Sequence, residues 1–329
     1  MIKHSPYANS NVLITGGMGF IGSNLARVLV AQGAKVTLVD SLIPEYGGNP
    51  LNINDIFDQV TVNICDVRDP HAIAYLVQGK DYLFNLAGQT SHLDSMLDPK
   101  TDLDINASAQ LSILEACRKA NPEIKIVFAS TRQIYGKPDY LPVDEKHLLR
   151  PVDVNGINKM AGEWYHILYN NVYGIRACAL RLTNTYGPCM RIKDARQTFL
   201  GIWVRQLLEG RPFEVWGGEQ KRDFTYVDDV VEGMLLAATS ETANGKVYNL
   251  GGTEVVTLTE LAELMVATNN GGQFEHHEFP CDRKRIDIGD YYADDSLIRD
   301  ELGWMPRVNL SEGLLRTLSY YRKHLRAYL

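Results

Sequence analysis

Residues 12–22 read Val12-Leu-Ile-Thr-Gly-Gly-Met-Gly-Phe-Ile-Gly22, and this stretch decides the fold. A short apolar run typical of a buried strand leads straight into glycines spaced as GxxGxxG. Apolar residues at helical spacing follow, up to Ala31. A strand that turns into a helix leaves backbone N–H groups unpaired over the helix start, and glycine lets that backbone approach a pyrophosphate closely. The stretch therefore predicts a strand, an anion-binding turn and a helix.

Later positions extend this site. A second predicted strand, Lys35–Asp40, ends in a carboxylate that can accept both ribose hydroxyls and would repel a 2′-phosphate, which favours NAD over NADP. Asp66 follows the third strand, where it can hold the adenine amino group, and small residues follow the fourth. We therefore predict an NAD site contacted by Gly16, Gly19, Phe20, Ile21, Gly22, Asp40, Asp66, Val67, Leu86, Ala87 and Gly88.

Strands and helices alternate through the first half of the chain. The predicted strands are Val12–Thr15, Lys35–Asp40, Val60–Cys65, Tyr82–Leu86, Ile124–Ala129 and Arg176–Leu182. The predicted helices between them are Ile21–Ala31, Pro70–Gln78, Asp102–Ala120 and Gly156–Asn171. This alternation predicts an α/β fold of the Rossmann class, a doubly wound parallel sheet with crossover helices on both faces.

The second half is less regular. It shows helical spacing at Val230–Ala238, at Leu258–Thr268 and from Ser311 to Leu329, and one more strand at Lys246–Leu250. We expect an NAD-binding Rossmann domain over residues 1–182, with residues from about 226–250 returning to it. A smaller, interleaved C-terminal α/β region, residues 183–225 and 251–329, would bind the substrate.

Composition excludes several classes of protein. The 329 residues carry a net charge of −7, whereas general nucleic-acid binders are usually basic. The five cysteines form no CxxC pair, which favours reduced thiols over a disulfide framework or a zinc site. His276 and His277 are adjacent and would face apart, so no metal is expected. A polar start and the lack of a membrane-length apolar run predict a cytoplasmic protein with no membrane partner.

Nearly the whole chain resembles the extended short-chain dehydrogenase/reductase family, the NAD-dependent epimerases and dehydratases of nucleotide sugars. Besides the GxxGxxG run, the markers are Asp66-Val-Arg-Asp69, Leu86-Ala-Gly-Gln89, Ser130-Thr-Arg-Gln-Ile-Tyr-Gly136, Lys159 with Glu163, Arg181-Leu-Thr-Asn-Thr-Tyr-Gly-Pro188, Arg222-Asp-Phe-Thr-Tyr-Val-Asp-Asp229, Asn249-Leu-Gly-Gly252, Tyr292-Ala-Asp294 and Leu302-Gly-Trp304. The resemblance implies an enzyme that binds NAD and a nucleotide-diphosphate sugar.

The resemblance also implies a catalytic set with one departure. In the family a hydroxyl residue, a tyrosine and a lysine four residues later handle the proton, and the lysine also binds the nicotinamide ribose. The matching positions here are Thr131, Asn155 and Lys159. An amide cannot ionise near neutral pH, so Asn155 cannot be the base, although it can hydrogen-bond a substrate hydroxyl or hold a water.

Two groups could replace the tyrosine as proton acceptor. The first is Lys159, alone or through a bound water, if burial lowers its pKa. The second is His92, just past the fourth strand in a predicted loop that would border the sugar. Tyr135 belongs to a Tyr-Gly pair after the fifth strand and is expected to serve in packing.

Residues 132 and 133 bear on the reaction. The family's 4,6-dehydratases carry an aspartate and a glutamate after the threonine, and its decarboxylases keep the glutamate, but here Arg132 and Gln133 stand there. The resemblance therefore favours an epimerase, an isomerase that returns its NAD unchanged. The Leu-Ala-Gly-Gln run and the threonine turn without acids look most like those of CDP-tyvelose (paratose) 2-epimerases, and nucleotide-sugar 4-epimerases are nearly as similar. The predicted substrate contacts are Thr131, Arg132, Gln133, Asn184, Arg222 and, within an Arg-Lys-Arg cluster, Arg283.

Two other functions stay open at this point: an unusual nucleotide-sugar dehydratase or oxidoreductase, and a catalytically silent NAD or nucleotide-sugar binding protein. Two helices also carry more apolar residues than one buried face needs. These are Leu103, Ile105, Leu111, Ile113 and Leu114 in the first, and Ile157, Met160, Trp164, Ile167 and Leu168 in the second. Since the family pairs these helices across a dimer, we expect a homodimer.

Overall fold

The computed structural model describes residues 5–280 and 284–329. Its centre is a seven-stranded sheet in the order β10-β6-β5-β4-β1-β2-β3, and all six pairings are parallel. The strands are β1 (Asn11–Thr15), β2 (Lys35–Asp40), β3 (Val60–Ile64), β4 (Tyr82–Asn85), β5 (Lys125–Thr131), β6 (Ala177–Leu182) and β10 (Val247–Leu250). This confirms the doubly wound α/β class.

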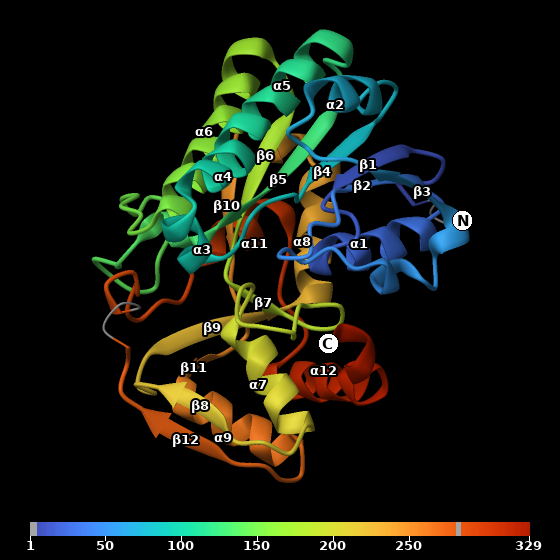
Figure 1. Cartoon of the computed structure of the whole chain (residues 1–329). Coiled ribbons are helices and arrows are strands. Elements are labelled where there is room, and N and C mark those ends of the chain that lie inside the picture. The colour runs from blue at the N-terminus through green and yellow to red at the C-terminus, as the bar shows by residue number, and fades with distance from the viewer. Residues whose placement is uncertain (1–4, 281–283) are drawn as a thin grey trace.

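Helices cover both faces of this sheet (Figure 1). One face carries α2 (Pro70–Leu76), α4 (Pro99–Leu103), α5 (Ala109–Ala120) and α6 (Val154–Tyr173). The other carries α1 (Phe20–Ala31) and α8 (Val227–Thr239), which pack against each other. Each central strand is buried on both sides, as parallel sheets require, and this explains their continuous apolar sequences.

A smaller region lies beyond one end of the sheet (Figure 1). It holds a three-stranded sheet, β11-β9-β7, and a two-stranded sheet, β12-β8. The strands are β7 (Asn184–Tyr186), β8 (Phe213–Trp216), β9 (Lys221–Tyr226), β11 (Val255–Thr257) and β12 (Phe274–His277), with helices α7 (Phe199–Leu208), α9 (Leu258–Thr268) and α12 (Leu310–His324). The short helix α11 (Ser296–Leu302) returns to pack beside β10.

The division into two domains stays a proposal, and two features of the main sheet support it. Strand β10 forms one edge of the main sheet beside β6, and α8 packs on β5 and β6. Within the described ranges, no helix has the length and apolar content needed to cross a membrane.

Two sequence-based expectations need correction. The predicted helix Asp102–Ala120 begins earlier, at Pro99, and is interrupted by a π-helical turn at Asp104–Ser108 before α5 continues it. His92 is not in a loop, because it opens the short helix α3 (His92–Leu97), where the Ser91 hydroxyl caps the helix by accepting from the Asp94 N–H at 3.1 Å.

Candidate active site

The carboxyl ends of the main strands open into a cavity of about 860 Å³ that continues under the smaller region. Open parallel sheets bind their ligands at this edge, where the strand order reverses. The cavity is lined by every predicted cofactor contact, by all four predicted catalytic residues, and by Arg132, Gln133, Asn184 and Arg222. The remaining predicted contact, Arg283, lies outside the described residues. The fold therefore brings the predicted residues together from separate segments of the chain.

The glycine turn between β1 and α1 is too tight for side chains. Gly16 has φ of +67°, a backbone conformation that favours glycine, and a Cβ on Gly22 would lie 2.3 Å from the Gly16 carbonyl oxygen. Gly19 is the N-cap of α1 and offers no side chain to the first N–H groups of the helix. A free helix start beside a cavity fits a dinucleotide pyrophosphate.

Asp40 ends β2 and lines the cavity. Its carboxylate accepts from the Met18 and Leu42 N–H groups, each at 3.0 Å, so it has a defined orientation. A Cβ on Gly48 would lie 2.5 Å from Asp40 Oδ1, which shows how closely the following loop passes. Burial raises the pKa of Asp40, although these backbone donors oppose the change. This geometry fits recognition of ribose hydroxyls.

Asp66 is less free than the sequence suggests. Its carboxylate pairs with the Arg68 guanidinium, with a shortest contact of 2.6 Å, and this hydrogen bond lowers the pKa of Asp66. Both Asp66 and Val67 still line the cavity. That Asp66 binds the adenine amino group therefore stays a prediction. Asp66 would have to accept that hydrogen bond while it remains paired with Arg68.

Lys159 on α6 is the buried cation of the site. Its Nζ donates to the Ala129 carbonyl at 3.2 Å and lies 5.1 Å from the centre of the Phe128 ring. A Cβ on Gly88 would lie only 2.8 Å from Nζ, so the ammonium sits directly beneath the small residues after β4. Burial lowers the pKa of Lys159 to about 8, while the charge of Asp102 opposes that shift.

Thr131, Arg132 and Gln133 leave the end of β5. Thr131 Oγ1 accepts from the Gln133 N–H at 3.2 Å, which caps a short 3₁₀ turn and leaves the hydroxyl proton free for another partner. The Gln133 amide donates to Asp153 Oδ2 at 2.9 Å. Arg132 Nη2 donates to Asn184 Oδ1 at 2.8 Å. Residues 132 and 133 thus supply no acid and no base to the cavity.

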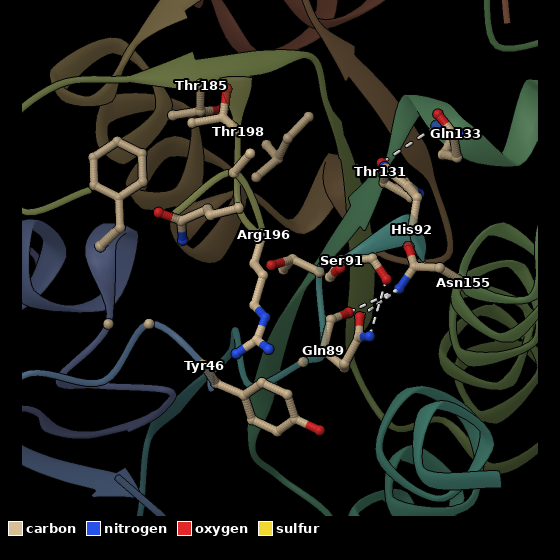
Figure 2. Close-up of a pocket in the computed structure, with 18 of the residues that line it drawn as sticks. Tyr46, Gln89, Ser91, His92, Thr131, Gln133, Asn155, Thr185, Arg196 and Thr198 are labelled. Carbon is tan, nitrogen blue, oxygen red and sulfur yellow. Dashed lines mark hydrogen bonds between the residues drawn. The ribbon is translucent and has the colours of Figure 1, made fainter. Parts of the chain in front are cut away.

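Asn155 is held by its amide nitrogen. Nδ2 donates to the Gln89 carbonyl at 2.8 Å and to Asp102 Oδ2 at 3.0 Å, and since both partners are acceptors, they dictate the orientation of the amide. Figure 2 shows the amide oxygen on the side away from Gln89, toward His92 and Thr131. Asn155 therefore presents an acceptor to the cavity, where the resembling family has a phenol.

Beneath Asn155 lies a fully buried carboxylate that the sequence did not reveal. Besides Asn155, Asp102 accepts from Asn158 Nδ2 at 2.8 Å and from Asn106 Nδ2 at 3.1 Å. Three asparagine side chains thus surround one anion. Asn155 is part of a buried hydrogen-bonded network rather than an isolated replacement.

His92 projects from the start of α3 into the same part of the cavity. Its Nδ1 lies 2.9 Å from Asp153 Oδ2, and the Asp153 side chain has no exposed surface. Burial favours the neutral acid, but the nearby His92 and the donors of Gly156 and Gln133 outweigh it and lower the pKa of Asp153. The site therefore contains a histidine paired with a buried carboxylate.

The far end of the cavity is positive. Arg222 on β9 is buried, donates to the Lys221 carbonyl at 2.9 Å and to the Gly289 carbonyl, and lies 3.2 Å from Asp287 Oδ1. Burial, and next the nearby Arg132 charge, lower the pKa of Arg222 to about 10. Arg132 Nη1 is shielded from solvent and has no hydrogen-bond partner. Two adjacent guanidiniums with a spare donor suit a diphosphate.

Sequence reasoning missed several residues that line the cavity. Figure 2 shows Tyr46, Gln89, Ser91, Thr185, Arg196 and Thr198 among them. Trp203 and Trp216 line the part within the smaller region. A usable signal was present for some of these, since Thr198 caps the apolar run that forms α7. Tyr135, as expected, is a packing residue whose buried hydroxyl bonds Asn249 and Arg181 at 2.7 Å each.

Comparison with known proteins agrees with this geometry. A sequence profile described as the NAD dependent epimerase/dehydratase family matches residues 12–251. UDP-glucose 4-epimerase of Mycolicibacterium smegmatis is 30% identical, over 94% of this chain and 98% of its own length. dTDP-glucose 4,6-dehydratase of Streptomyces griseus is 29% identical, over 96% and 95%. The crystal structure of UDP-glucose 4-epimerase from Thermotoga maritima with UDP-glucose matches with a TM-score of 0.88 at 30% identity, over 96% of this chain and 99% of that one.

Proposed function

The chain belongs to the NAD-dependent epimerase/dehydratase family, and we propose that within it the protein is a nucleotide-sugar epimerase with a non-standard proton acceptor. The enzyme uses NAD, which when bound accepts a hydride from a sugar carbon and later returns it to either face. Because the cofactor ends each cycle unchanged, tight retention of NAD serves this reaction better than exchange.

One observation carries the proposal: a single cavity joins the glycine turn to the buried arginine pair. The dinucleotide end holds Gly19 and Asp40, the middle holds Thr131 and Lys159, and the far end holds Arg222. A dinucleotide in the first part and a diphosphate sugar in the last would bring the sugar beside Thr131. A nucleotide sugar of the kind named for the relatives has the length and charge that this cavity suits.

The distribution of carboxylates favours epimerisation over elimination. Among the described residues that line the cavity, the acids are Asp40, Asp66, Asp194, Glu214 and Asp287. Asp66, Asp194 and Asp287 are paired with arginines, and the Glu214 carboxylate accepts from the Trp216 indole N–H at 2.9 Å. Asp40 lies at the end of β2. The threonine turn contributes none, and loss of water from a sugar requires a paired acid and base there.

The chain's own residues would act as follows. Lys159 would bond the nicotinamide ribose and stabilise negative charge on a nearby oxygen. Thr131 would donate its free hydroxyl proton to the reacting sugar oxygen, and Asn155 Oδ1 would accept from a neighbouring sugar hydroxyl. Arg222 and Arg132 would hold the diphosphate, which leaves the sugar able to turn over between the two hydride transfers.

The test begins with the protein as purified. Mass spectrometry of its small molecules should reveal retained NAD. Mixing it with UDP-glucose, dTDP-glucose, UDP-glucuronate or CDP-paratose should produce transient NADH absorbance with at least one sugar, and NMR of the product should show inversion at one carbon without added cofactor. Net NADH accumulation or loss of water would identify an oxidoreductase or a dehydratase instead. Silence with every sugar would favour a binding protein.

A homodimer is the second part of the proposal. Along α6, Ile157, Trp164, Leu168 and Val172 are 49%, 55%, 50% and 60% exposed. Their spacing of seven, four and four residues puts them on one face of the helix. Ile105, Ile113 and Leu114 of the neighbouring helical segment are buried in the core, so the excess of apolar residues there is smaller than the sequence predicted. The exposed stripe belongs to α6 and Leu103, and a second copy of this chain would cover it.

A further inference from the structure

His92, which lines the cavity, and the buried Asp153 behind it form a pair that the family's usual catalytic set does not contain. Asp153 is the N-cap of α6, where Oδ1 accepts from the Gly156 N–H at 2.6 Å. Its other oxygen, Oδ2, accepts from Gln133 Nε2 at 2.9 Å and faces His92 Nδ1 at 2.9 Å. The carboxylate is thus held from two sides and fully buried, whereas the histidine side chain is 39% exposed.

This arrangement has the logic of a histidine base oriented by an acid. A carboxylate at Nδ1 favours the tautomer with its proton on Nδ1, which leaves Nε2 as the free acceptor. The 2.9 Å distance between His92 Nδ1 and Asp153 Oδ2 is that of an ion pair, but the orientation of the ring does not give a hydrogen bond. A small rotation of the half-exposed ring would align it, and catalytic hydrogen bonds commonly tighten in this way when substrate binds.

The two other polar side chains of the catalytic set on α6, Asn155 and Lys159, are already engaged in hydrogen bonds. Both amide protons of Asn155 are donated to Gln89 and Asp102, and an amide is not a base. Lys159, with its pKa lowered to about 8, is mainly an ammonium at neutral pH and donates to the Ala129 carbonyl. An ammonium has no lone pair with which to take a proton. A neutral imidazole, in contrast, has a nitrogen lone pair that can accept a proton.

We propose that His92 Nε2 is the proton acceptor of the reaction and that Asp153 positions it. The inference rests on the proposed epimerase function. As the sugar carbon gives up its C–H electron pair as a hydride to the oxidised cofactor, the O–H bond of the same carbon breaks. The proton passes to Nε2, and the O–H electron pair becomes the second bond of the ketone. On the return, His92 gives that proton back to the oxygen.

The first test removes the imidazole. H92Q keeps a polar side chain of similar reach at a half-exposed position, so it should keep the thermal midpoint and the retained NAD of the wild type. Transient NADH formation with whichever of UDP-glucose, dTDP-glucose, UDP-glucuronate or CDP-paratose the wild type oxidises should fall by about 100-fold or more. The control H71Q changes an exposed histidine on α2, outside the cavity, and should leave that rate unchanged.

The second test addresses Asp153 with a readout that a purely structural role would not move. In D153N the negative charge is lost, but asparagine caps a helix as well as aspartate does. The matched control is D69N, at the N-cap of α2. In side-chain nitrogen NMR, the His92 signals, identified by their loss in H92Q, should show Nδ1 protonated in the wild type. They should change in D153N and not in D69N.

The outcomes separate two failures. If the wild type is silent with every sugar, the epimerase function is wrong and the inference falls with it. If the wild type is active and H92Q matches H71Q, the inference alone is overturned. A His92 tautomer that carries its proton on Nε2, or one that D153N leaves unchanged, also overturns the pairing. Should H92Q lose NAD, restoration of H92A activity by added imidazole supports the proposal, and failure of that rescue contradicts it.

Discussion

At the scale of single residues, Asn155 both lines the cavity and stabilises the buried Asp102 carboxylate by a hydrogen bond. A carboxylate with no exposed surface costs several kcal/mol unless hydrogen bonds compensate it, on the order of 1–3 kcal/mol for each bond to a charged group. Asn155, Asn158 and Asn106 supply three such bonds. A tyrosine at 155 could offer one hydroxyl at most, and at a different reach. The asparagine and the buried acid therefore make sense as a set.

The variant N155Y tests that set. If the asparagine were only a decayed tyrosine, the substitution would restore turnover. We expect turnover to fall instead, because Asp102 and the Gln89 carbonyl each lose a hydrogen-bond donor. For the same reason the free energy of unfolding should fall by about 1–3 kcal/mol. Urea unfolding and transient NADH formation measure the two effects. The control is N171Y at an exposed position of the same helix, which should change neither. A faster N155Y enzyme would contradict this account.

Lys159 gives a pH-dependent prediction whose sign can be worked out. Its pKa is about 8 in the folded protein against 10.5 ordinarily, so between these values the unfolded chain holds more protons at this residue. The free energy of unfolding therefore rises with pH across that window, by at most about 1.4 kcal/mol per pH unit. Below the window Lys159 is protonated in both states, so it adds no dependence on pH.

K159M lacks this group and provides the measurement. The free energy of unfolding of the wild type minus that of K159M should grow as the pH is raised from about 8 to about 10.5. Buried tyrosines and other groups that titrate nearby are common to both proteins and cancel. K146M, at an exposed lysine, should show a flat difference from the wild type over the same range. A flat difference for K159M as well would mean that Lys159 is not buried as a charge.

At the residue level, the sequence led to the cavity where motifs are local. Asn155, Lys159 and Thr131 could be placed because each has a set position relative to β5 and α6. Asp102 and Asp153 could not, since their importance arises from contacts 53 and 20 residues away in the chain. A buried carboxylate and an exposed one look alike in a sequence.

At the scale of elements, the glycine turn lends itself to a graded test. A Cβ on Gly22 would lie 2.3 Å from the Gly16 oxygen and 2.9 Å from Gly17 Cα, whereas one on Gly19 would meet only the Gly16 oxygen at 3.1 Å. G22A should therefore force β1 and α1 apart and lose both retained NAD and thermal stability.

G19A is its matched control for strain. It should fold with a smaller change in thermal midpoint, because its one tight contact needs a shift of only a few tenths of an ångström. Differential scanning fluorimetry and the NAD content of the purified protein provide the comparison. Equal losses in the two variants would show that strain in the turn is not the deciding factor.

Element prediction was accurate for the main sheet and poor beyond it. All six strands predicted in the first half are present, within two residues at each end, and Lys35–Asp40 and Leu258–Thr268 match without error. Buried parallel strands can be recognised in a sequence as apolar runs between helical segments. The strands β7, β8, β9, β11 and β12 were missed because their short sequences mix polar with apolar residues. No continuous apolar run therefore distinguishes them from loops.

At the scale of the whole molecule, the apolar stripe of α6 connects assembly to the site. Asn155 and Lys159 face inward from the same helix whose outer face carries Ile157, Trp164 and Leu168. A partner packed on that face would hold the helix against the sheet, and so steady the Asp153 cap and the catalytic side chains. Assembly and catalysis should then weaken together.

The double variant W164E/L168E tests this link. Two carboxylates on the stripe repel their counterparts across a two-fold axis and cannot be desolvated cheaply, so the assembly should dissociate, as multi-angle light scattering would show. We expect the monomer to retain its fold by circular dichroism, since both residues are half-exposed, but to bind NAD less tightly. T239E on α8, which packs on the other face of the sheet, is the charge control and should leave the molar mass unchanged. A wild type that is monomeric at all concentrations would refute the dimer, and a dissociated variant with unchanged NAD retention would refute its link to the site.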